Sequence, residues 1–342
     1  MDRVSQAVKD LVEEIQRMPE APDPAETDRH AFTLLLSGIA ACRRAPGIPC
    51  HMGYRTLYRC GDEPASEELK AHLFRLYGIY DRESLEKVCM EQFTSGREYE
   101  QFMTFWCDAP LFDLEELEEK GRRAFETRFK RASLFRPYVG ERGFYAWDIN
   151  ERIGLGRLAC ACGIIDRETF DELIDYQVRK AQVFYHTFKD YAVSCICGAV
   201  YDVPGGDEED MLSFLDLNKK LALHLLEEGG AWYRNAWYAP EKREWVSLLP
   251  HNGGCIVSKQ IEEGRAIGYM YRDSRPSEQW ADTGWRFFAG DESDEYSRNP
   301  DNFTIWSLND ICNLDATILG YAEAKEGSAF GRNAKGEWQR ER

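Results

Sequence analysis

Residues 163–178 read GIIDRETFDELIDYQV, and a similar stretch, GIYDRESLEKVCMEQF, begins at Gly78. In both, apolar side chains recur at i, i+3, i+4 and i+8, the spacing of one buried helical face. These positions are Phe170, Leu173, Ile174 and Val178 in one stretch, and Leu85, Val88, Cys89 and Phe93 in the other. Each copy begins with Gly-Ile, which ends a preceding helix, followed by an Asp that can cap the next one. We therefore predict helix-turn-helix construction used twice, as an internal pseudo-repeat in an all-helical domain.

Helical spacing extends outward from this pair in both directions. The N-terminal MDRVSQAVKDLVEEIQRM is typical of an amphipathic helix, because its charges interrupt any apolar signal-peptide core. Towards the C-terminus the helical pattern continues to about Glu228, where GGAWYRNAWYAP interrupts it with Gly and Pro.

The pattern changes after LLPHNGG, which ends at Gly254. The four runs CIVSK, AIGYMYR, GWRFFAG and FTIWSL are typical of strands, since they are short, rich in β-branched and aromatic residues and separated by turn-forming residues. A short helix is expected at SLNDICNL, with Ser307 or Asn309 as its N-cap. The sequence thus predicts an all-α domain over residues 1–248 and a small α+β domain over residues 250–342.

The formal net charge of −17 disfavours nucleic acid and anionic membranes as partners, because both require concentrated positive charge. It favours a basic partner, although solubility alone also explains an acidic surface. No apolar run approaches the roughly eighteen residues of a membrane span. The eleven cysteines include two C-x-C pairs, Cys160/Cys162 and Cys195/Cys197, inside expected helices. Their spacing favours buried, reduced thiols over zinc ligands, so we expect a cytoplasmic protein without a structural metal.

Motifs of common enzyme classes are missing from the sequence. None of the six histidines belongs to H-E-x-x-H, and no nucleophile elbow, P-loop or dinucleotide fingerprint occurs. One polar cluster has two interpretations: Trp147, Asp148, Arg152 and Arg157 lie within WDINERIGLGR. Asp148 and Arg152 are four apart and can pair beside the indole, either to bind a ligand carboxylate or phosphate or to lock two helices together. The second interpretation is the more common one for polar pairs on amphipathic helices. We predict a non-enzymatic protein with no cofactor.

The stretch GWRFFAGDESDEYSRNPDN, residues 284–302, sets aromatic residues beside a dense group of acids. The acids lack the alternate spacing and the turn glycine of an EF-hand calcium loop, and no nucleophile or base recurs nearby. A protein interface remains, since aromatic side chains rimmed by charge are typical of one, but alternate aromatics in WRFF would equally fill a small core. The candidate partner-binding residues are Trp285, Phe287, Phe288, Asp291, Glu292, Asp294, Glu295 and Tyr296.

The motifs GYMYR, DTGWRFFAGDESDEY, NPDNF, SLN and GSAFGR occur in this order in the C-terminal part. With them, this part resembles the immunity-protein-33-like domain (domain of unknown function 2185) of bacterial polymorphic-toxin systems. The resemblance implies a small cytoplasmic α+β module without established enzymatic activity, whose partner is a cognate toxin.

Two motifs of the helical part, AWDINERIGLGRLACACGIID and AWYRNAWY, resemble domain of unknown function 1266 over about residues 70–240. We therefore predict an immunity-type protein that binds and neutralises a toxin. The alternative is a ligand-binding or enzymatic helical domain with the C-terminal module as its regulator. Fusion to a large helical domain departs from lone, short immunity domains, and leaves open whether that domain binds the toxin, binds something else or only scaffolds.

Overall fold

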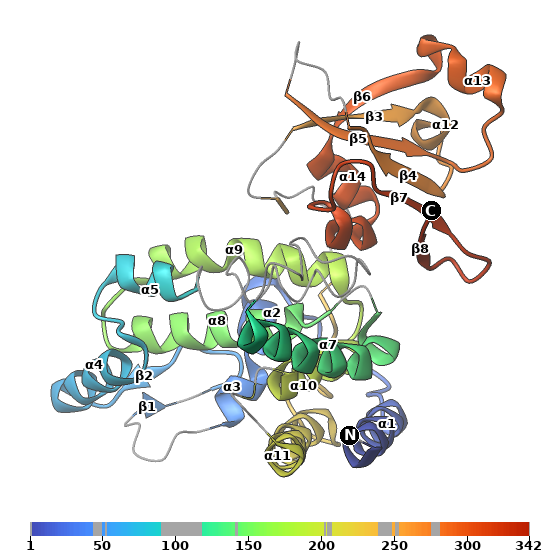
Figure 1. Ribbon diagram of the computed structural model, residues 1–342. Coiled ribbons are helices and arrows are strands. Elements are labelled where there is room, and N and C mark those ends of the chain that lie inside the picture. Colours follow the sequence, from blue (N-terminus) through green and yellow to red (C-terminus); the bar gives the residue numbers. More distant parts are fainter. Residues whose placement is uncertain are drawn as a thin grey trace. The chain divides into compact units, whose positions relative to one another are not determined.

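The computed structural model describes residues 2–43, 50–51, 53–89, 118–140, 143–201, 203, 207–238, 248–249, 253–274 and 281–341. They form two compact units (Figure 1): a helical unit within residues 1–244 and a C-terminal unit that includes residues 245–342.

The helical unit consists of α-helices and one minimal antiparallel pair of strands, β1 (Cys50–His51) and β2 (Arg59–Cys60). The helices are α1 (Asp2–Arg17), α2 (Arg29–Leu36), α3 (Gly38–Cys42), α4 (Glu63–Tyr77), α5 (Arg82–Cys89), α7 (Glu119–Val139), α8 (Tyr145–Ala161), α9 (Arg167–Phe184), α10 (Phe188–Tyr201) and α11 (Glu208–Leu226). The prediction of a helical N-terminal part is confirmed.

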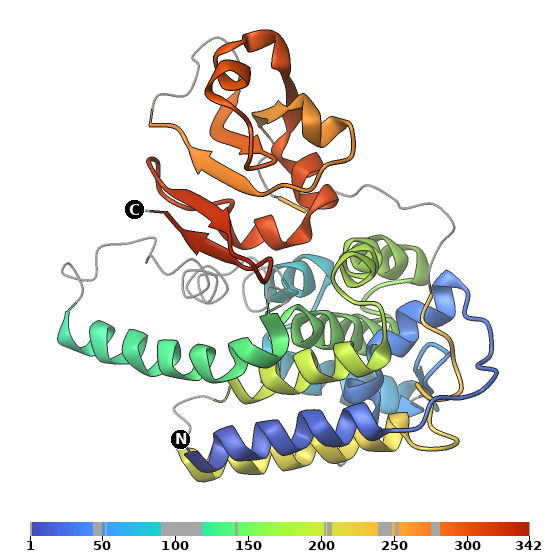
Figure 2. The same cartoon turned by 90° about the vertical axis from the view of Figure 1, so that its right-hand side faces the viewer.

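Helix α8 is the central element of the helical unit, and side chains on nearly all of its faces are buried. Small residues let its neighbours approach closely. A Cβ on Gly198 of α10 would lie 2.4 Å from the Cβ of Trp147, and one on Gly154 would lie 2.8 Å from the Cβ of Ala40. Helices α1 and α11, far apart in the sequence, lie side by side (Figure 2), and the apolar stripe of α1 is fully buried.

The two turns of the repeated motif have the local form that the sequence predicts. Gly78 and Gly163 have φ angles of 68° and 76°, left-handed values that favour glycine at a helix end. The carboxylates of Asp81 and Asp166 each accept a backbone N–H three residues further on, both at 2.8 Å. Equivalence of the two whole helix pairs stays a prediction, and Phe93 lies outside the described residues.

The C-terminal unit contains a mixed six-stranded sheet in the order β6-β3-β5-β4-β7-β8, in which only β3 and β5 run parallel. The strands are β3 (Gly254–Ser258), β4 (Tyr269–Arg272), β5 (Asp282–Phe288), β6 (Phe303–Ser307), β7 (Ala329–Arg332) and β8 (Trp338–Arg340). The helices are α12 (Lys259–Glu262), α13 (Asp294–Arg298), η4 (Pro300–Asn302), α14 (Leu308–Leu314) and η5 (Ala316–Tyr321). The four predicted strands and the helix capped by Ser307 are confirmed, whereas β7 and β8 were not predicted.

One face of this sheet forms the core of the unit. Trp285 donates its indole N–H to the carbonyl of Ala322 at 3.0 Å, and the rings of Tyr321 and Phe330 lie 4.8 Å apart, so the chain around α14 and η5 covers this face. Its buried apolar strand residues are Cys255, Val257, Met270, Trp285, Phe287, Phe330 and Trp338.

Candidate functional site

Strand β5 divides the aromatic candidates between the two faces of the sheet, because successive side chains of a strand point to opposite sides. Trp285 and Phe287 point to the core face, where both are 0% exposed and their rings stack at 5.9 Å. Partner contact by these two rings would require opening the core, which corrects the prediction made for them. The other interpretation of WRFF, aromatic residues filling a small core, describes them correctly.

The opposite face carries a row of half-buried rings. Phe288 stacks on Tyr271 at 5.9 Å and meets Phe303 edge-on at 5.5 Å, and Tyr269 lies 6.1 Å from both Tyr271 and Phe288. The strand register places Ile305, which is 60% exposed, on the same face. We call these five side chains, Tyr269, Tyr271, Phe288, Phe303 and Ile305, the aromatic face.

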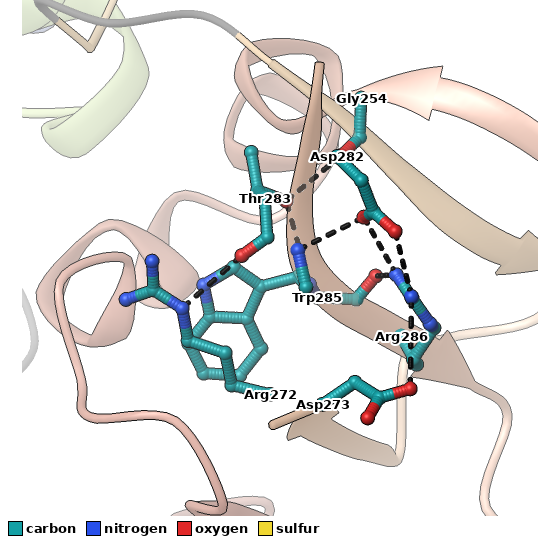
Figure 3. Close-up of polar contacts among 8 residues, drawn as sticks. Gly254, Arg272, Asp273, Asp282, Thr283, Trp285 and Arg286 are labelled. Carbon is teal, nitrogen blue, oxygen red and sulfur yellow. Dashed lines mark hydrogen bonds and ion pairs between the residues drawn. The ribbon is translucent and has the colours of Figure 1, made fainter. Parts of the chain in front are cut away.

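A buried ion pair fixes the middle of the same side of the sheet (Figure 3). The guanidinium of Arg286 donates to both carboxylate oxygens of Asp282 at 2.8 Å. A carboxylate oxygen of Asp273 lies 3.7 Å from the same guanidinium group. Burial alone would lower the pKa of Arg286, but the hydrogen bond and charge of Asp282 raise it overall. Beside the pair, Thr283 donates to the carbonyl of Gly254 at 2.8 Å and ties β5 to β3. The pair therefore has a structural role.

The acidic candidates have different roles, although they are consecutive in the sequence. Glu292 accepts the backbone N–H groups of Ala289 and Gly290 at 2.7 and 2.8 Å and closes the turn after β5. Burial alone would raise the pKa of Glu292, but these hydrogen bonds lower it overall. Asp291 forms an ion pair with Arg265 at 2.7 Å, and this hydrogen bond lowers the pKa of its carboxyl group.

Asp294 and Glu295 are the free acids of the group. Both are exposed in the first turn of α13, which Ser293 caps, and neither makes an ion pair within the part of the chain that the structure describes. Tyr296 follows them with its ring 6.0 Å from that of Phe303, and its hydroxyl donates to the carbonyl of Asn302 at 3.1 Å. The free carboxylates therefore lie next to one end of the aromatic face.

The three charged residues of the polar cluster in the helical unit, Asp148, Arg152 and Arg157, are buried, and Trp147 is half-buried. Arg157 is 0% exposed, donates to Ser37 Oγ at 2.8 Å and to the carbonyl of Thr56 at 2.6 Å, and stacks 3.8 Å above the ring of Tyr58. Arg152 donates to the carbonyl of Cys89 and so connects α8 to α5. These contacts join α8 to α5, to the junction of α2 and α3, and to the segment before β2.

Trp147 and Asp148 are the other two residues of that cluster. The guanidinium of Arg43 lies 4.8 Å from the centre of the Trp147 ring, and Asp148 is 9% exposed. A cleft of about 270 Å³ lies elsewhere, between α2 and α9. Its lining residues are Arg29, His30, Thr33, Arg167, Asp171, Ile174, Asp175 and Val178.

Sequence reasoning missed Tyr269, Tyr271, Phe303 and Ile305 as members of a surface. Their alternation in GYMYR and FTIWS was visible, but only the pairing of β4 and β6 with their neighbours shows that they share a face. Among the described residues, no cluster of His, Cys, Asp and Glu is arranged to hold a metal ion. Likewise, none of the described helices is both long and apolar enough to cross a membrane.

Comparison with known families gives two matches in this chain. Residues 255–342 match the immunity protein Imm33 domain, and residues 72–237 match a family described as protein of unknown function (DUF1266). No curated protein and no solved structure matches. The chain therefore contains two family domains, a DUF1266 region followed by an immunity protein Imm33 domain.

Proposed function

We propose that this protein is a bacterial immunity protein that binds and neutralises a cognate toxin in the cytoplasm through its C-terminal unit. The observation that carries the proposal is the match of residues 255–342 to the Imm33 domain. Such a role needs binding and no chemistry, so we propose that this unit is not an enzyme. The surplus of acids in the chain, with a net charge of −17, favours a basic toxin.

The acidic segment, residues 291–295, supports the proposal with fewer residues than the sequence suggested. Asp294 and Glu295 are exposed, and Tyr296 and Phe288 beside them are half-buried. Exposed rim charges act chiefly on the rate of association and on the choice of partner. Glu292 holds a turn and Asp291 is paired, so we assign the steering role to Asp294 and Glu295 first.

The test first searches the genome neighbourhood for a gene that encodes a toxin. It then co-expresses this protein with that toxin, scores survival of the host cells and measures affinity with the purified pair. Unmodified protein should protect the cells and bind the toxin. The double variant Asp294→Lys/Glu295→Lys should slow association, most strongly at low salt, and leave the melting temperature nearly unchanged.

A matched control keeps the change of total charge equal. Glu323 and Glu326 are exposed near the turn before β7, so Glu323→Lys/Glu326→Lys alters the net charge as much in another place. This control should bind almost normally. Failure of the unmodified protein to bind or protect would refute the proposed function, and equal loss in both double variants would refute the role of the acidic segment.

A further inference from the structure

The structure points to the aromatic face as the toxin-contact surface, and we propose that it accepts a cationic protein surface whose Arg and Lys side chains lie on its rings. This inference rests on the proposed function and goes beyond it, because it names both the surface and the chemistry of the partner.

The aromatic face has the composition of an interface rather than of an ordinary sheet surface. Four rings continue from β4 to β5 and, over Ser258 of the intervening β3, to β6, with centres 5.5 to 6.1 Å apart. Ile305 on β6 is 60% exposed, more than any other large apolar side chain described in this unit. A contiguous exposed apolar patch on a protein surface marks an interaction site more often than scattered single residues do.

The rings have capacity for polar contacts as well. The hydroxyls of Tyr269 and Tyr271 form no hydrogen bond with the residues that the structure describes. Both side chains are only half-buried. Tyrosine is enriched in interfaces because it combines a large apolar ring with such a polar group.

Charge around the aromatic face determines the kind of partner. Asp294 and Glu295 lie next to its Phe303 end, and Asp301 lies in η4, directly before β6. At the other end Glu341 reaches over Gly331, where a Cβ would lie 2.6 Å from its carboxylate oxygen. On the sheet itself the guanidinium of Arg286 is already held by Asp282.

Three further cations, Lys259, Arg265 and Arg298, lie near the acidic end, Lys259 directly after Ser258, which donates to the Tyr296 hydroxyl. Arg265 is paired with Asp291, and Arg298 sits in the last turn of α13, so the acids outnumber the cations there. The faces of aromatic rings attract cations, and flanking carboxylates strengthen this preference. A surface of Arg and Lys side chains is therefore the complementary partner.

The first experiment maps the surface on the unmodified chain, so no variant can complicate it by misfolding. Hydroxyl-radical labelling with mass spectrometry compares the full-length protein alone and in complex with the toxin identified by the co-expression test. Labelling of Tyr269, Tyr271, Phe303 and Ile305 should fall in the complex. Phe74 and Tyr80 of the helical unit, which are 61% and 67% exposed, serve as reporters and should not change. Unchanged labelling of the aromatic face in a complex that forms would overturn the inference.

The second experiment tests the sign of the partner's charge. Ile305→Lys and Tyr271→Lys should each weaken toxin binding by about tenfold or more, because an added cation repels the partner and removes apolar contact. Ile305→Glu should bind clearly better than Ile305→Lys. Phe74→Lys is the matched control, since its side chain is as exposed as that of Ile305, and should bind normally.

The outcomes separate this inference from the proposed function. Binding by the unmodified protein with no loss in the lysine variants would overturn the aromatic face and leave the immunity role standing. Equal loss for Ile305→Lys and Ile305→Glu would overturn the cationic partner. An unmodified protein that does not bind the toxin would refute the proposed function itself, and the inference with it.

Discussion

At the scale of single residues, the acids of the 291–295 run are chemically alike but structurally different. Glu292 accepts two backbone N–H groups, Asp291 pairs with Arg265, and Asp294 and Glu295 face solvent. The sequence revealed the cluster but not this division, because a carboxylate's role depends on which N–H groups the turn brings within hydrogen-bond distance. The same holds for Trp285 and Phe287: alternation predicts that they share a face, but only the packing of α14 and η5 on that face shows that it is the core.

Removing the carboxylate of Glu292 should destabilise the C-terminal unit. Glu292→Gln should lower the free energy of unfolding by about 1 kcal/mol, since charged hydrogen bonds to two N–H groups are weakened in a partly solvated site. Its pKa is lowered in the folded state, so its contribution is present above the unfolded-state pKa and is lost as the pH falls through the folded-state value. Urea unfolding at pH 7 and near pH 3 measures both effects. The exposed Glu295→Gln should change little at either pH, and equal effects of the two variants would contradict the assignment.

Lys180 predicts a pH dependence of the opposite sign for the helical unit. It is 2% exposed, its ammonium lies 3.8 Å from the centre of the Tyr145 ring, and burial lowers its pKa to about 7, against the attraction of Asp148. Between pH 7 and its usual value of about 10.4, the unfolded chain binds the proton that the folded chain has lost, so Lys180 makes stability rise with pH.

The measurement must separate the contribution of Lys180 from those of other groups that titrate between pH 7 and pH 9.5. Burial raises the pKa values of the Cys195 and Cys197 thiols, which makes stability fall as the pH rises. The difference between the unmodified protein and Lys180→Met cancels these contributions. In urea unfolding at pH 7 and pH 9.5, Lys180→Met should be the more stable protein at pH 7, and its advantage should shrink at pH 9.5. A constant difference would show that Lys180 keeps an ordinary pKa.

At the scale of secondary structure, the periodicity of apolar residues predicts the longer helices and strands. The strands that it does not predict are held in place by pairing with distant parts of the chain. Helix α9 and strands β3 to β6 have clear apolar periods, and the structure confirms them. Strands β7 and β8 are short, and their sequences AFGR and WQR carry too few apolar residues to show alternation. Their pairing with β4 and with each other places them in the sheet, and this long-range information has no local signal.

Gly268 illustrates a close backbone contact on which the position of β7 depends. Its N–H donates to the carbonyl of Phe288 at 3.0 Å and its carbonyl accepts from Arg332 at 2.9 Å, so it bridges β5 and β7. A Cβ at this position would lie 2.1 Å from the carbonyl oxygen of Ala289, so the backbone at Gly268 or just after β5 would have to move. Gly268→Ala should therefore lower the free energy of unfolding by about 2 kcal/mol or more. Gly61→Ala, where the added Cβ meets nothing within 4 Å, is the control and should be nearly neutral in the same denaturant titration. Two equally stable variants would contradict this account of the bridge.

At the scale of the whole molecule, the sequence predicts that residues from Leu249 onward fold without the helical domain. The C-terminal unit has its own buried aromatic cluster, in which Trp285, Phe287 and Phe330 pack on one side of the sheet. A chain of about 90 residues is long enough to bury a self-sufficient core. A fragment beginning at Leu249 should therefore melt cooperatively and show the near-ultraviolet circular dichroism of immobilised tryptophan.

The same fragment tests which of the two units binds the toxin. If the aromatic face and the acidic segment are the toxin-contact surface, the fragment carries all of it and should bind the toxin nearly as tightly as the full chain. The helical domain would then add stability or a separate interaction, and its removal would change the melting behaviour more than the affinity. A flat, non-cooperative melt would refute independent folding and the boundary near Leu249. A fragment that melts cooperatively but has lost its affinity would move the toxin contact into the DUF1266 region, because correct folding would exclude damage to the sheet as the cause.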